Sequence, residues 1–288
     1  MKQQGYLPNL LVIGAMKCGT TSLHEYLNQH PDIFMSEKKE INFFVEEMDW
    51  GKGVEWYKSH FPTRSIIRGE SSQNYSKAHM HAGVPDRIHR MIPDVKLLYV
   101  VRDPIARLHS HYFENIFGDQ APEDLNQSLR DFRQHHYVRT SSYFQQLSAF
   151  LPFFPKDQIL VVETEAMKRD RLAVMNEIFR FLQVAELPDD SVFDFEANTR
   201  ATKKRPTALA KFIRSSASAS LRKIMPTALK QKIKGQDWMQ KMQYTQIEAT
   251  ISQTKLDPAL ADKIRNHLGE DMAALRKWTG KKFSDWSC

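Results

Sequence analysis

Short apolar runs alternate along the chain with segments in which apolar positions recur every three or four residues. The runs typical of strands cover residues 10–13, 65–70, 97–101 and 159–163. The helical spacing covers residues 20–28, 86–91, 141–150, 167–182 and 258–278. Because strands and helices alternate, we expect an α/β fold with a central parallel sheet flanked by helices.

Length and composition leave this prediction unchanged. The chain has 288 residues, 41% hydrophobic and 26% charged, which fits one globular domain with a large core. We interpret residues 1–288 as a single domain, with a basic helical subregion at 201–257 and a C-terminal helix and tail at 258–288. We see no apolar window of membrane-spanning length, no signal-peptide pattern and no disulfide framework, since the cysteines are Cys18 and Cys288. We expect a cytoplasmic, bacterial protein and leave its oligomeric state open.

Residues 9–23, NLLVIGAMKCGTTSL, have the strand, loop and helix pattern of a phosphate-binding site. Gly14 ends the strand, Lys17 and Gly19 lie in the loop, and three hydroxyl residues open the helix. A helix start offers unpaired N–H groups and a partial positive charge to an anion. In the ATP-binding P-loop a lysine directly follows the second glycine, but this chain has Thr20 there. The displaced lysine favours a donor other than ATP, with a P-loop-type kinase or NTPase as the alternative.

Residues 96–112, KLLYVVRDPIARLHSHY, form a second strand–helix unit. Arg102 stands at the carboxyl end of the strand, where open α/β sheets bind their ligands. Pro104 suits the first helical turn, and Ser110 can share a helix face with Arg107. This unit therefore adds a candidate anion-binding arginine beside the first loop.

Together these segments resemble the two nucleotide-binding motifs of sulfotransferases that use 3′-phosphoadenosine 5′-phosphosulfate (PAPS). The likeness is to the heparan-sulfate-type branch and its bacterial relatives. Further matching segments are QHPD at 29–32, KEINFF at 39–44, SSYFQQL at 141–147, FFPKDQILVVETE at 153–165 and the terminal Phe283 and Trp286. The resemblance covers roughly residues 9–200 and the C-terminal end. It implies a P-loop-like domain that moves a sulfuryl group from PAPS to a hydroxyl, or less readily an amine, and releases 3′,5′-ADP.

The resemblance also implies a donor site. Lys17 stabilises the departing 3′,5′-ADP, while Arg102 and Ser110 bind the 3′-phosphate. Tyr143 packs against or hydrogen-bonds to the nucleotide, with a core tyrosine as the alternative. The complete set of implied donor-binding residues is Lys17, Cys18, Gly19, Thr20, Thr21, Ser22, Arg102, Ser110, Tyr143, Lys203, Lys204 and Arg205. Because the sulfuryl oxygens carry one formal negative charge, we expect no metal to be required.

A general base must take the proton of the acceptor hydroxyl. Glu40 occupies the position of the catalytic acid in heparan-sulfate-type enzymes, so the resemblance implies Glu40 as base. Glu70, His109 and His111 are the alternatives. A lysine commonly follows the counterpart of Glu70 in the glycosaminoglycan enzymes, but this chain has Ser71. The acceptor, a carbohydrate or small molecule, is therefore left open.

The net charge of +7 is concentrated between residues 201 and 236, a stretch that contains ten basic residues and no acid. Its apolar periodicity indicates basic amphipathic helices. They could be a solvated face, a cover over the donor phosphates, or a contact for an anionic acceptor or membrane surface. We expect no specific nucleic-acid binding, because the stretch has few aromatic residues. A non-enzymatic, basic nucleotide-binding protein is the last alternative.

Overall fold

The computed structural model describes residues 5–117, 124–193, 204–206, 244–246 and 256–288. They belong to two compact units. The first comprises residues 1–111, 131–197 and 258–288, and the second comprises residues 112–130 and 198–257. The single domain predicted over residues 1–288 stays a prediction.

A five-stranded parallel sheet organises the first unit, in the order β2-β3-β1-β4-β5. The strands are β1 (Leu10–Gly14), β2 (Ile33–Met35), β3 (Ile67–Ser71), β4 (Lys96–Val101) and β5 (Ile159–Glu163). All five residues of β1 are buried, as a central strand covered on both faces requires. This confirms the predicted α/β fold and its four predicted strands, and it adds β2.

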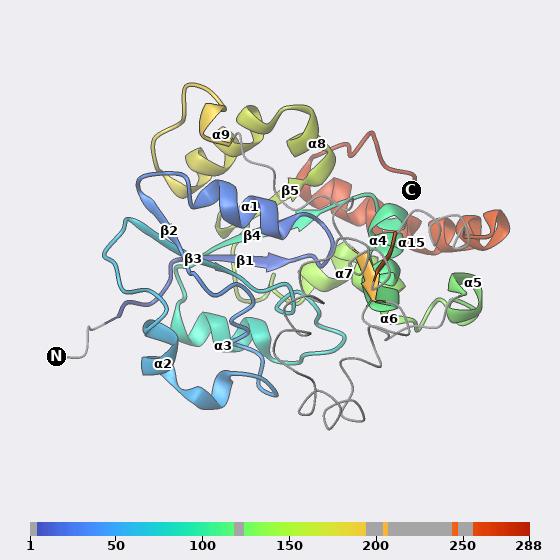
Figure 1. Ribbon diagram of the computed structural model, residues 1–288, viewed down its shortest axis with the longest axis horizontal. Helices are drawn as coiled ribbons and strands as arrows, with labels where there is room; N and C mark the ends of the chain where they lie inside the picture. Colours follow the sequence, from blue (N-terminus) through green and yellow to red (C-terminus); the bar gives the residue numbers. More distant parts are fainter. Residues whose placement is uncertain (1–4, 118–123, 194–203, 207–243, 247–255) are drawn as a thin grey trace, which may run out of the picture. The chain divides into compact units, whose positions relative to one another are not determined.

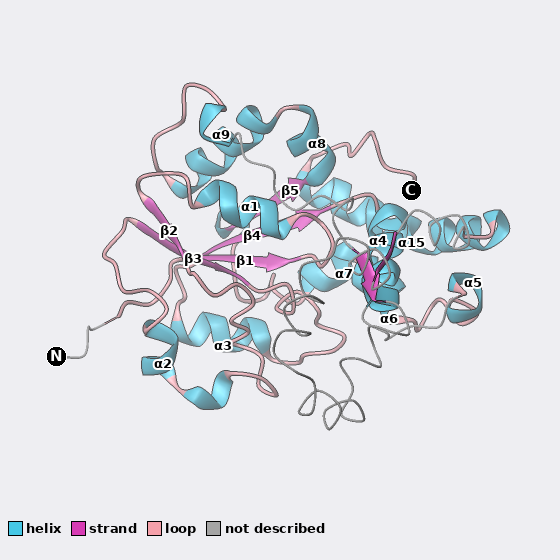
Figure 2. Ribbon diagram, in the orientation of Figure 1, coloured by secondary structure: helices cyan, strands magenta, loops and turns pink. Residues whose placement is uncertain are grey.

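Helices cover both faces of this sheet (Figures 1 and 2). In Figure 1, α1 (Thr20–Leu27), α8 (Thr164–Arg169) and α9 (Arg171–Leu182) lie above the strands, and α2 (Val54–Lys58) and α3 (Val84–Met91) lie below. Four further helices of the chain are α4 (Pro104–Phe117), α6 (His136–Ser141), α7 (Tyr143–Ser148) and α15 (Pro258–Thr279). Short 3-10 turns occur at Trp50–Lys52, Lys156–Gln158 and Ser191–Phe193.

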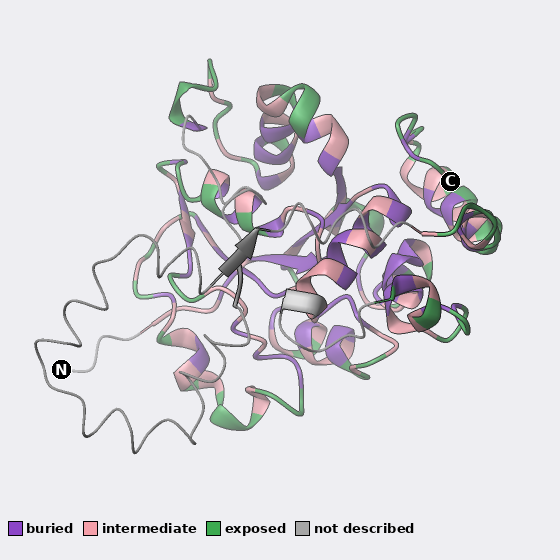
Figure 3. Ribbon diagram, turned by 45° about the vertical axis from the view of Figure 1, so that its right-hand side comes forward, coloured by how far each residue is buried: buried purple, intermediate pink, exposed green. Residues whose placement is uncertain are grey.

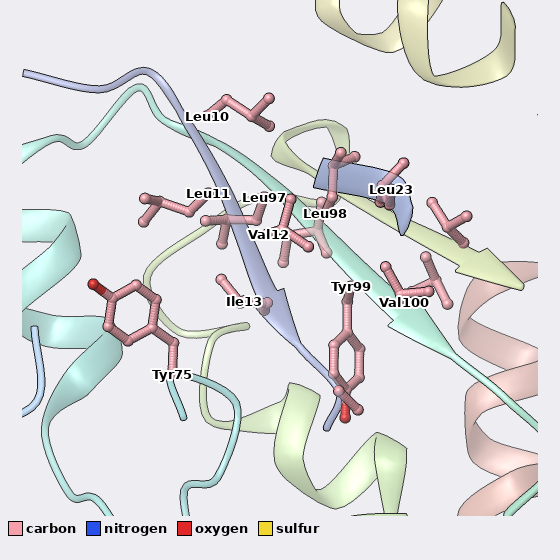
Figure 4. Close-up of a cluster of buried hydrophobic side chains, with 14 of the residues drawn as sticks. Leu10, Leu11, Val12, Ile13, Leu23, Tyr75, Leu97, Leu98, Tyr99 and Val100 are labelled. Carbon is pink, nitrogen blue, oxygen red and sulfur yellow. The ribbon is translucent and has the colours of Figure 1, made fainter. Parts of the chain in front are cut away.

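The core lies between the sheet and these helices. Figure 4 shows the apolar side chains of β1 and β4 together with Leu23 of α1 and Tyr75. The strands appear as buried in Figure 3, whereas exposed residues lie on the outer turns. Because consecutive strand residues point to opposite faces, the continuous apolar runs seen in the sequence serve both helical layers.

Two predicted helices have different bounds in the structure. The periodicity at 167–182 is interrupted at Asp170, whose carboxylate accepts the Ala173 N–H at 3.0 Å and begins α9. The predicted helix at 141–150 is interrupted at Ser142, between α6 and α7. The break at Asp170 uses a side chain that competes with the helical backbone for hydrogen bonds, whereas no side chain caps α7 at Ser142.

The described part of the second unit contains α5 (Leu125–Ser128) and an antiparallel pair, β6 (Lys204–Pro206) with β7 (Tyr244–Gln246). The backbone at 204–206 is thus extended within the predicted helical subregion. Pro206 disfavours a helical conformation of the residue before it, which accounts for the difference. The rest of the basic stretch lies outside the described residues. In the ranges that the structure describes, no helix has the length and apolar character of a membrane span.

Candidate active site

β1 leads into a tight loop at the carboxyl edge of the sheet. Gly14 has φ of +146°, and a Cβ atom there would lie 2.1 Å from the Ser76 hydroxyl oxygen, so the position requires glycine. Lys17 and Gly19 also have positive φ values, 69° and 87°. For Lys17 this backbone conformation costs about 1–3 kcal/mol, and such strain is concentrated at functional sites.

The loop ends at the start of α1. Gly19 is the N-cap, and no side chain caps this helix. The Leu23 N–H donates to the Gly19 carbonyl at 3.1 Å. The N–H groups of Thr20, Thr21 and Ser22 therefore have no acceptor within the helix. Such N–H donors and the partial positive charge of a helix start are suited to a phosphate.

Neighbouring strands hold the loop in place. The Ala15 N–H donates to the Val100 carbonyl at 2.7 Å. The Thr164 hydroxyl lies 2.6 Å from the Cys18 carbonyl and 2.8 Å from the Val101 carbonyl. The loop is consequently attached to the ends of β4 and β5, as preorganised anion binding requires.

Cys18 and Tyr143 occupy the buried side of the loop. Burial raises the pKa of the Cys18 thiol to about 11, so the thiol stays protonated at neutral pH. The Cys18 N–H donates to the Ala15 carbonyl at 3.2 Å. The Tyr143 hydroxyl donates to the Arg102 carbonyl at 2.8 Å and lies 3.5 Å from the Cys18 sulfur. Tyr143 is therefore buried in the core, which was the alternative to a nucleotide contact. The nucleotide contacts predicted for Cys18 and Tyr143 stay predictions.

Arg102 follows β4 at the same edge of the sheet. Its side chain is 18% exposed, and its Nε lies 3.9 Å from a carboxylate oxygen of Glu165. Glu165 also accepts the Asp103 N–H at 3.2 Å and the Trp286 indole N–H at 3.3 Å. The C-terminal tail therefore helps to orient the carboxylate beside Arg102.

Arg107 and Ser110 are both buried on α4. The Arg107 guanidinium donates to the Met16 carbonyl at 3.4 Å and to the Ser141 hydroxyl at 2.7 Å, and it also donates to the Tyr137 carbonyl. Arg107 therefore connects α4 to the loop after β1. Ser110 lies one turn further along the helix, and its predicted contact with the 3′-phosphate stays a prediction.

Glu40 lies close to the start of α1. Its φ of 58° is left-handed, and its side chain is 28% exposed. The carboxylate accepts the Lys39 ammonium at 2.8 Å and the Gln73 N–H at 3.0 Å. The Lys39 ammonium also lies 3.4 Å from the Thr20 hydroxyl. One lysine, which the sequence analysis did not single out, thus joins the candidate base to the first residue of α1.

Glu70 has the opposite environment. Its carboxylate is fully buried and accepts the hydroxyls of Tyr57 at 2.7 Å, Tyr75 at 2.6 Å and Ser72 at 2.6 Å. Burial raises the pKa of Glu70 above its usual value. With both oxygens occupied and no exposure to solvent, Glu70 is suited to hold the structure rather than to exchange a proton.

The two histidines weighed as bases lie on α4. The His111 Nδ1 atom lies 3.2 Å from the Arg107 guanidinium and accepts from it. Burial, followed by the charge of Arg107, lowers the pKa of His111 far below its usual range. His111 is therefore buried, neutral and a weak base, while His109 is half-buried. Of the four candidates, Glu40 has both solvent access and a link to α1.

A cleft of about 500 Å³ opens beside the start of α1. It lies between α1 and the connection of α8 to α9, and its size suits a small-molecule ligand. Its lining residues are Gly19, Ser22, Tyr26, Thr164, Met167, Lys168, Arg169, Asp170, Arg171, Leu172 and Asp190. A ligand phosphate at the helix start would leave the rest of the ligand beside this cleft.

Lys203, predicted as a donor ligand, lies outside the described residues, and the backbone of Lys204 and Arg205 belongs to β6. Within the described ranges, no three His, Cys, Asp or Glu side chains are grouped as metal ligands. A further lysine, Lys77, is buried near Glu40 and Arg107. Nothing in its local sequence marks it, since its burial arises from tertiary packing.

The family model of the sulfotransferase domain matches residues 7–285. Human heparan sulfate glucosamine 3-O-sulfotransferase 5 is 32% identical over 193 residues, which cover 62% of this chain and 54% of that protein. A bifunctional heparan sulfate N-deacetylase/N-sulfotransferase 1 from Caenorhabditis elegans is 26% identical over 63% of this chain and 23% of its own length. The chain thus spans about half or less of the length of these relatives.

Two solved structures share the fold. A sulfotransferase from Alicyclobacillus acidocaldarius superposes with a TM-score of 0.65 at 23% identity, covering 98% of this chain and 100% of that one. A mouse sulfotransferase complexed with PAP superposes with a TM-score of 0.51 at 18% identity, covering 93% of this chain and 85% of that one. At these identities the similarity establishes the architecture.

Proposed function

The chain belongs to the sulfotransferase domain family, and we propose that it transfers a sulfuryl group from PAPS to a hydroxyl of a small or carbohydrate acceptor. The observation that carries this proposal is the position of Glu40. Lys39 joins its carboxylate to Thr20 at the start of α1, so a proton acceptor stands next to a phosphate-binding helix start.

The donor is held by its two phosphates and its nucleoside. Thr20, Thr21 and Ser22 donate backbone N–H groups to the 5′-phosphate, and Lys17 neutralises the bridging oxygen that leaves. Arg102 binds the 3′-phosphate, because a guanidinium matches phosphate oxygens in pairs. The adenosine lies in the cleft that begins at Gly19 and Ser22.

Transfer is an in-line displacement at sulfur. The acceptor oxygen forms an S–O bond while the bond to the bridging oxygen of the 5′-phosphate breaks. The electron pair of that bond leaves with 3′,5′-ADP, and the acceptor proton passes to the Glu40 carboxylate. Lys17 matters most in the transition state, where the charge on the leaving phosphate grows.

The surroundings of Glu40 include apolar surface that suits an amphipathic acceptor. The Asn74 amide donates to the Asn42 side chain at 3.2 Å and approaches the Met48 sulfur at 3.7 Å. Met48 and Met80 are 45% and 50% exposed. Exposed methionines offer an adaptable apolar surface, and residues 46 and 47 are both acidic. Glu46 is paired with Arg87 at 3.2 Å, and Glu47 lies 3.6 Å from His81.

A two-step experiment tests this function. First, thermal unfolding is compared for the protein alone, with 3′,5′-ADP and with ATP–Mg²⁺, because a ligand of the native state raises its stability. We expect the larger shift with 3′,5′-ADP. Second, labelled PAPS is offered with neutral sugars, phenols, aliphatic alcohols and heparan fragments. Stabilisation by ATP–Mg²⁺ alone would identify a nucleoside triphosphate enzyme instead.

A further inference from the structure

Lys77 ends the segment of residues 72–77, which follows β3 and crosses the carboxyl edge of the sheet. The Ser72 N–H donates to the Val12 carbonyl at 3.1 Å, and the Ser76 N–H donates to the Ile13 carbonyl at 2.9 Å. Ser76 also fills the space next to Gly14. Lys77 therefore emerges beside the point where β1 passes into the phosphate-binding loop, and it is only 7% exposed.

In the part of the chain that the structure describes, the Lys77 ammonium has one hydrogen-bond partner. It donates to the Asn74 side-chain oxygen at 2.7 Å, and Asn74 in turn donates to Asn42, next to the Glu40 loop. Among the residues that the structure describes, no carboxylate lies within ion-pair distance of this ammonium. A lysine ammonium has three donors, and a buried charge requires a paired charge or a full set of hydrogen bonds.

A second buried cation lies near Lys77. Arg107 is fully buried, and its partners in the described part of the chain are the carbonyls of Met16 and Tyr137, the Ser141 hydroxyl and His111. None of these partners is an anion. The charged and titratable groups that act on Lys77 or respond to it are Arg107, Glu40, His79, His81, His111 and His136. Burial and then Arg107 lower the pKa of Lys77 to about 8, against the opposite effect of Glu40.

We propose that Lys77 is a catalytic residue whose ammonium donates a hydrogen bond to a non-bridging oxygen of the transferring sulfuryl group. The inference rests on the proposed function, because the sulfuryl group must pass between the loop after β1 and Glu40. Lys77 is next to that loop and linked to the Glu40 loop through Asn74 and Asn42. The donor anion then brings negative charge to a place where the described partners of the two buried cations are neutral.

Lys77 neither forms nor breaks a covalent bond in this step. It stays protonated while sulfur exchanges the bridging phosphate oxygen for the acceptor oxygen, and the acceptor proton goes to Glu40. The ammonium holds the sulfuryl oxygens in place and limits the repulsion between them and the incoming acceptor oxygen. Such preorganised charge is a usual source of rate enhancement.

The test compares PAPS with 3′,5′-ADP, which differ by the sulfuryl group. Lys77→Met keeps the length of the side chain and removes its charge. We expect the affinity for PAPS to fall by about 10- to 100-fold, the usual effect of losing a charged hydrogen bond. The affinity for 3′,5′-ADP should change by less than about threefold. With a working acceptor, turnover should fall by about 10²- to 10³-fold.

Matched variants separate this role from a structural one. Lys281→Met removes a lysine paired with Glu177 on another surface and should leave the PAPS to 3′,5′-ADP affinity ratio unchanged. Lys77→Arg keeps the charge and should restore part of the PAPS preference. In the ligand-free protein, Lys77→Met should preserve or raise the unfolding temperature, since it removes an unpaired buried charge. A lysine needed only for folding would lower it.

The wild-type protein provides an independent measurement should Lys77→Met fail to fold. Its preference for PAPS over 3′,5′-ADP should decrease as the pH rises above about 8, because the ammonium then loses its proton. An unchanged affinity ratio and turnover in Lys77→Met, or an affinity ratio of the wild type independent of pH, overturns the role of Lys77 alone. A wild type that binds no 3′,5′-ADP overturns the proposed function and this inference together.

Discussion

Glu40 and Glu70 belong to two neighbouring segments, because the Glu40 N–H donates to the carbonyl of Ser71, the residue after Glu70, at 2.9 Å. Their surroundings nevertheless differ in access to solvent. Glu40 is part-exposed and has a lysine and one backbone N–H as partners, whereas Glu70 is enclosed by three hydroxyls. At the scale of single residues, this difference separates a candidate base from a structural acid.

Glu40→Gln tests the first role. Glutamine keeps the size of the side chain but does not take up the acceptor proton, so turnover should fall by about two to four orders of magnitude. The affinity for 3′,5′-ADP should change little, because the carboxylate serves the acceptor. Steady-state turnover and a binding titration measure the two effects. Glu55→Gln, at an exposed glutamate paired with Lys58, is the matched control. Near-normal turnover in Glu40→Gln would transfer the role of base to another group.

Glu70→Gln tests the second role. An amide group would face the Ser72 or tyrosine hydroxyls that now donate to a carboxylate, so a buried donor loses its acceptor. The free energy of unfolding should fall by about 1.5–3 kcal/mol, as for a hydrogen bond to a charged group. Urea denaturation measures this loss. Turnover of the folded variant should stay within about tenfold of wild type, well below the loss expected for a catalytic base. A large loss of turnover without a loss of stability would contradict the assignment.

Site residues could be predicted from the sequence where a local pattern, such as an apolar strand, fixes their position. Lys17 and Arg102 follow apolar strands, so their place at the carboxyl edge of the sheet could be predicted. Lys39 and Lys77 could not, because their importance arises from contacts between segments distant in the chain. Tyr143 had two possible environments in the sequence, and the packing of α7 places it in the core.

Elements were predictable to the extent that their pattern is long and uninterrupted. β1, β4, β5 and α15 match apolar runs or helical periodicities closely. β2 has three residues, too few to show a period. The break at Asp170 depends on a side-chain cap that interrupts the periodicity, and α7 begins after Ser142 without a side-chain cap.

His24 connects elements around the site. Its Nε2–H donates to the Ser36 carbonyl at 3.1 Å, so its Nδ1 accepts the Ser71 hydroxyl at 2.9 Å. This histidine of α1 thus holds the ends of β2 and β3 in register beside Glu40. Burial, together with the charge of Lys39, lowers the pKa of His24 from 6.5 to about 4.

The low pKa of His24 has a consequence for stability against pH. The unfolded chain binds a proton at this site below about pH 6.5, while the folded chain does so only near pH 4. The contribution of His24 to the free energy of unfolding should therefore be fully present above pH 6.5. It should decline by up to about 3 kcal/mol as the pH falls toward 4. Urea denaturation between pH 4.5 and 7.5 measures it. His24→Gln should show a shallower decline, and an equal slope in both proteins would contradict the assignment.

At the scale of the whole molecule, the fold brings two candidate anion-binding features to one edge of a sheet. The loop after β1 and Arg102 after β4 are adjacent because those strands pair in parallel. The net charge of +7 adds a general attraction for an anionic donor. The sequence predicted a parallel sheet with Arg102 at the carboxyl end of a strand, but the pairing of β1 with β4 comes from the structure. Most of the basic stretch lies outside the described residues.

We expect the chain to bind a nucleotide by two separate phosphates without a metal. Calorimetric titration in EDTA with 3′,5′-ADP and with 5′-AMP tests it directly. We expect a Kd for 3′,5′-ADP of about 1 µM or lower. The Kd for 5′-AMP should be about 10- to 100-fold higher, and Arg102→Ala should remove most of that difference, about 1.5–3 kcal/mol. Equal affinities of the wild type for the two nucleotides would contradict a separate 3′-phosphate site. Binding that requires a divalent metal would contradict metal-free binding.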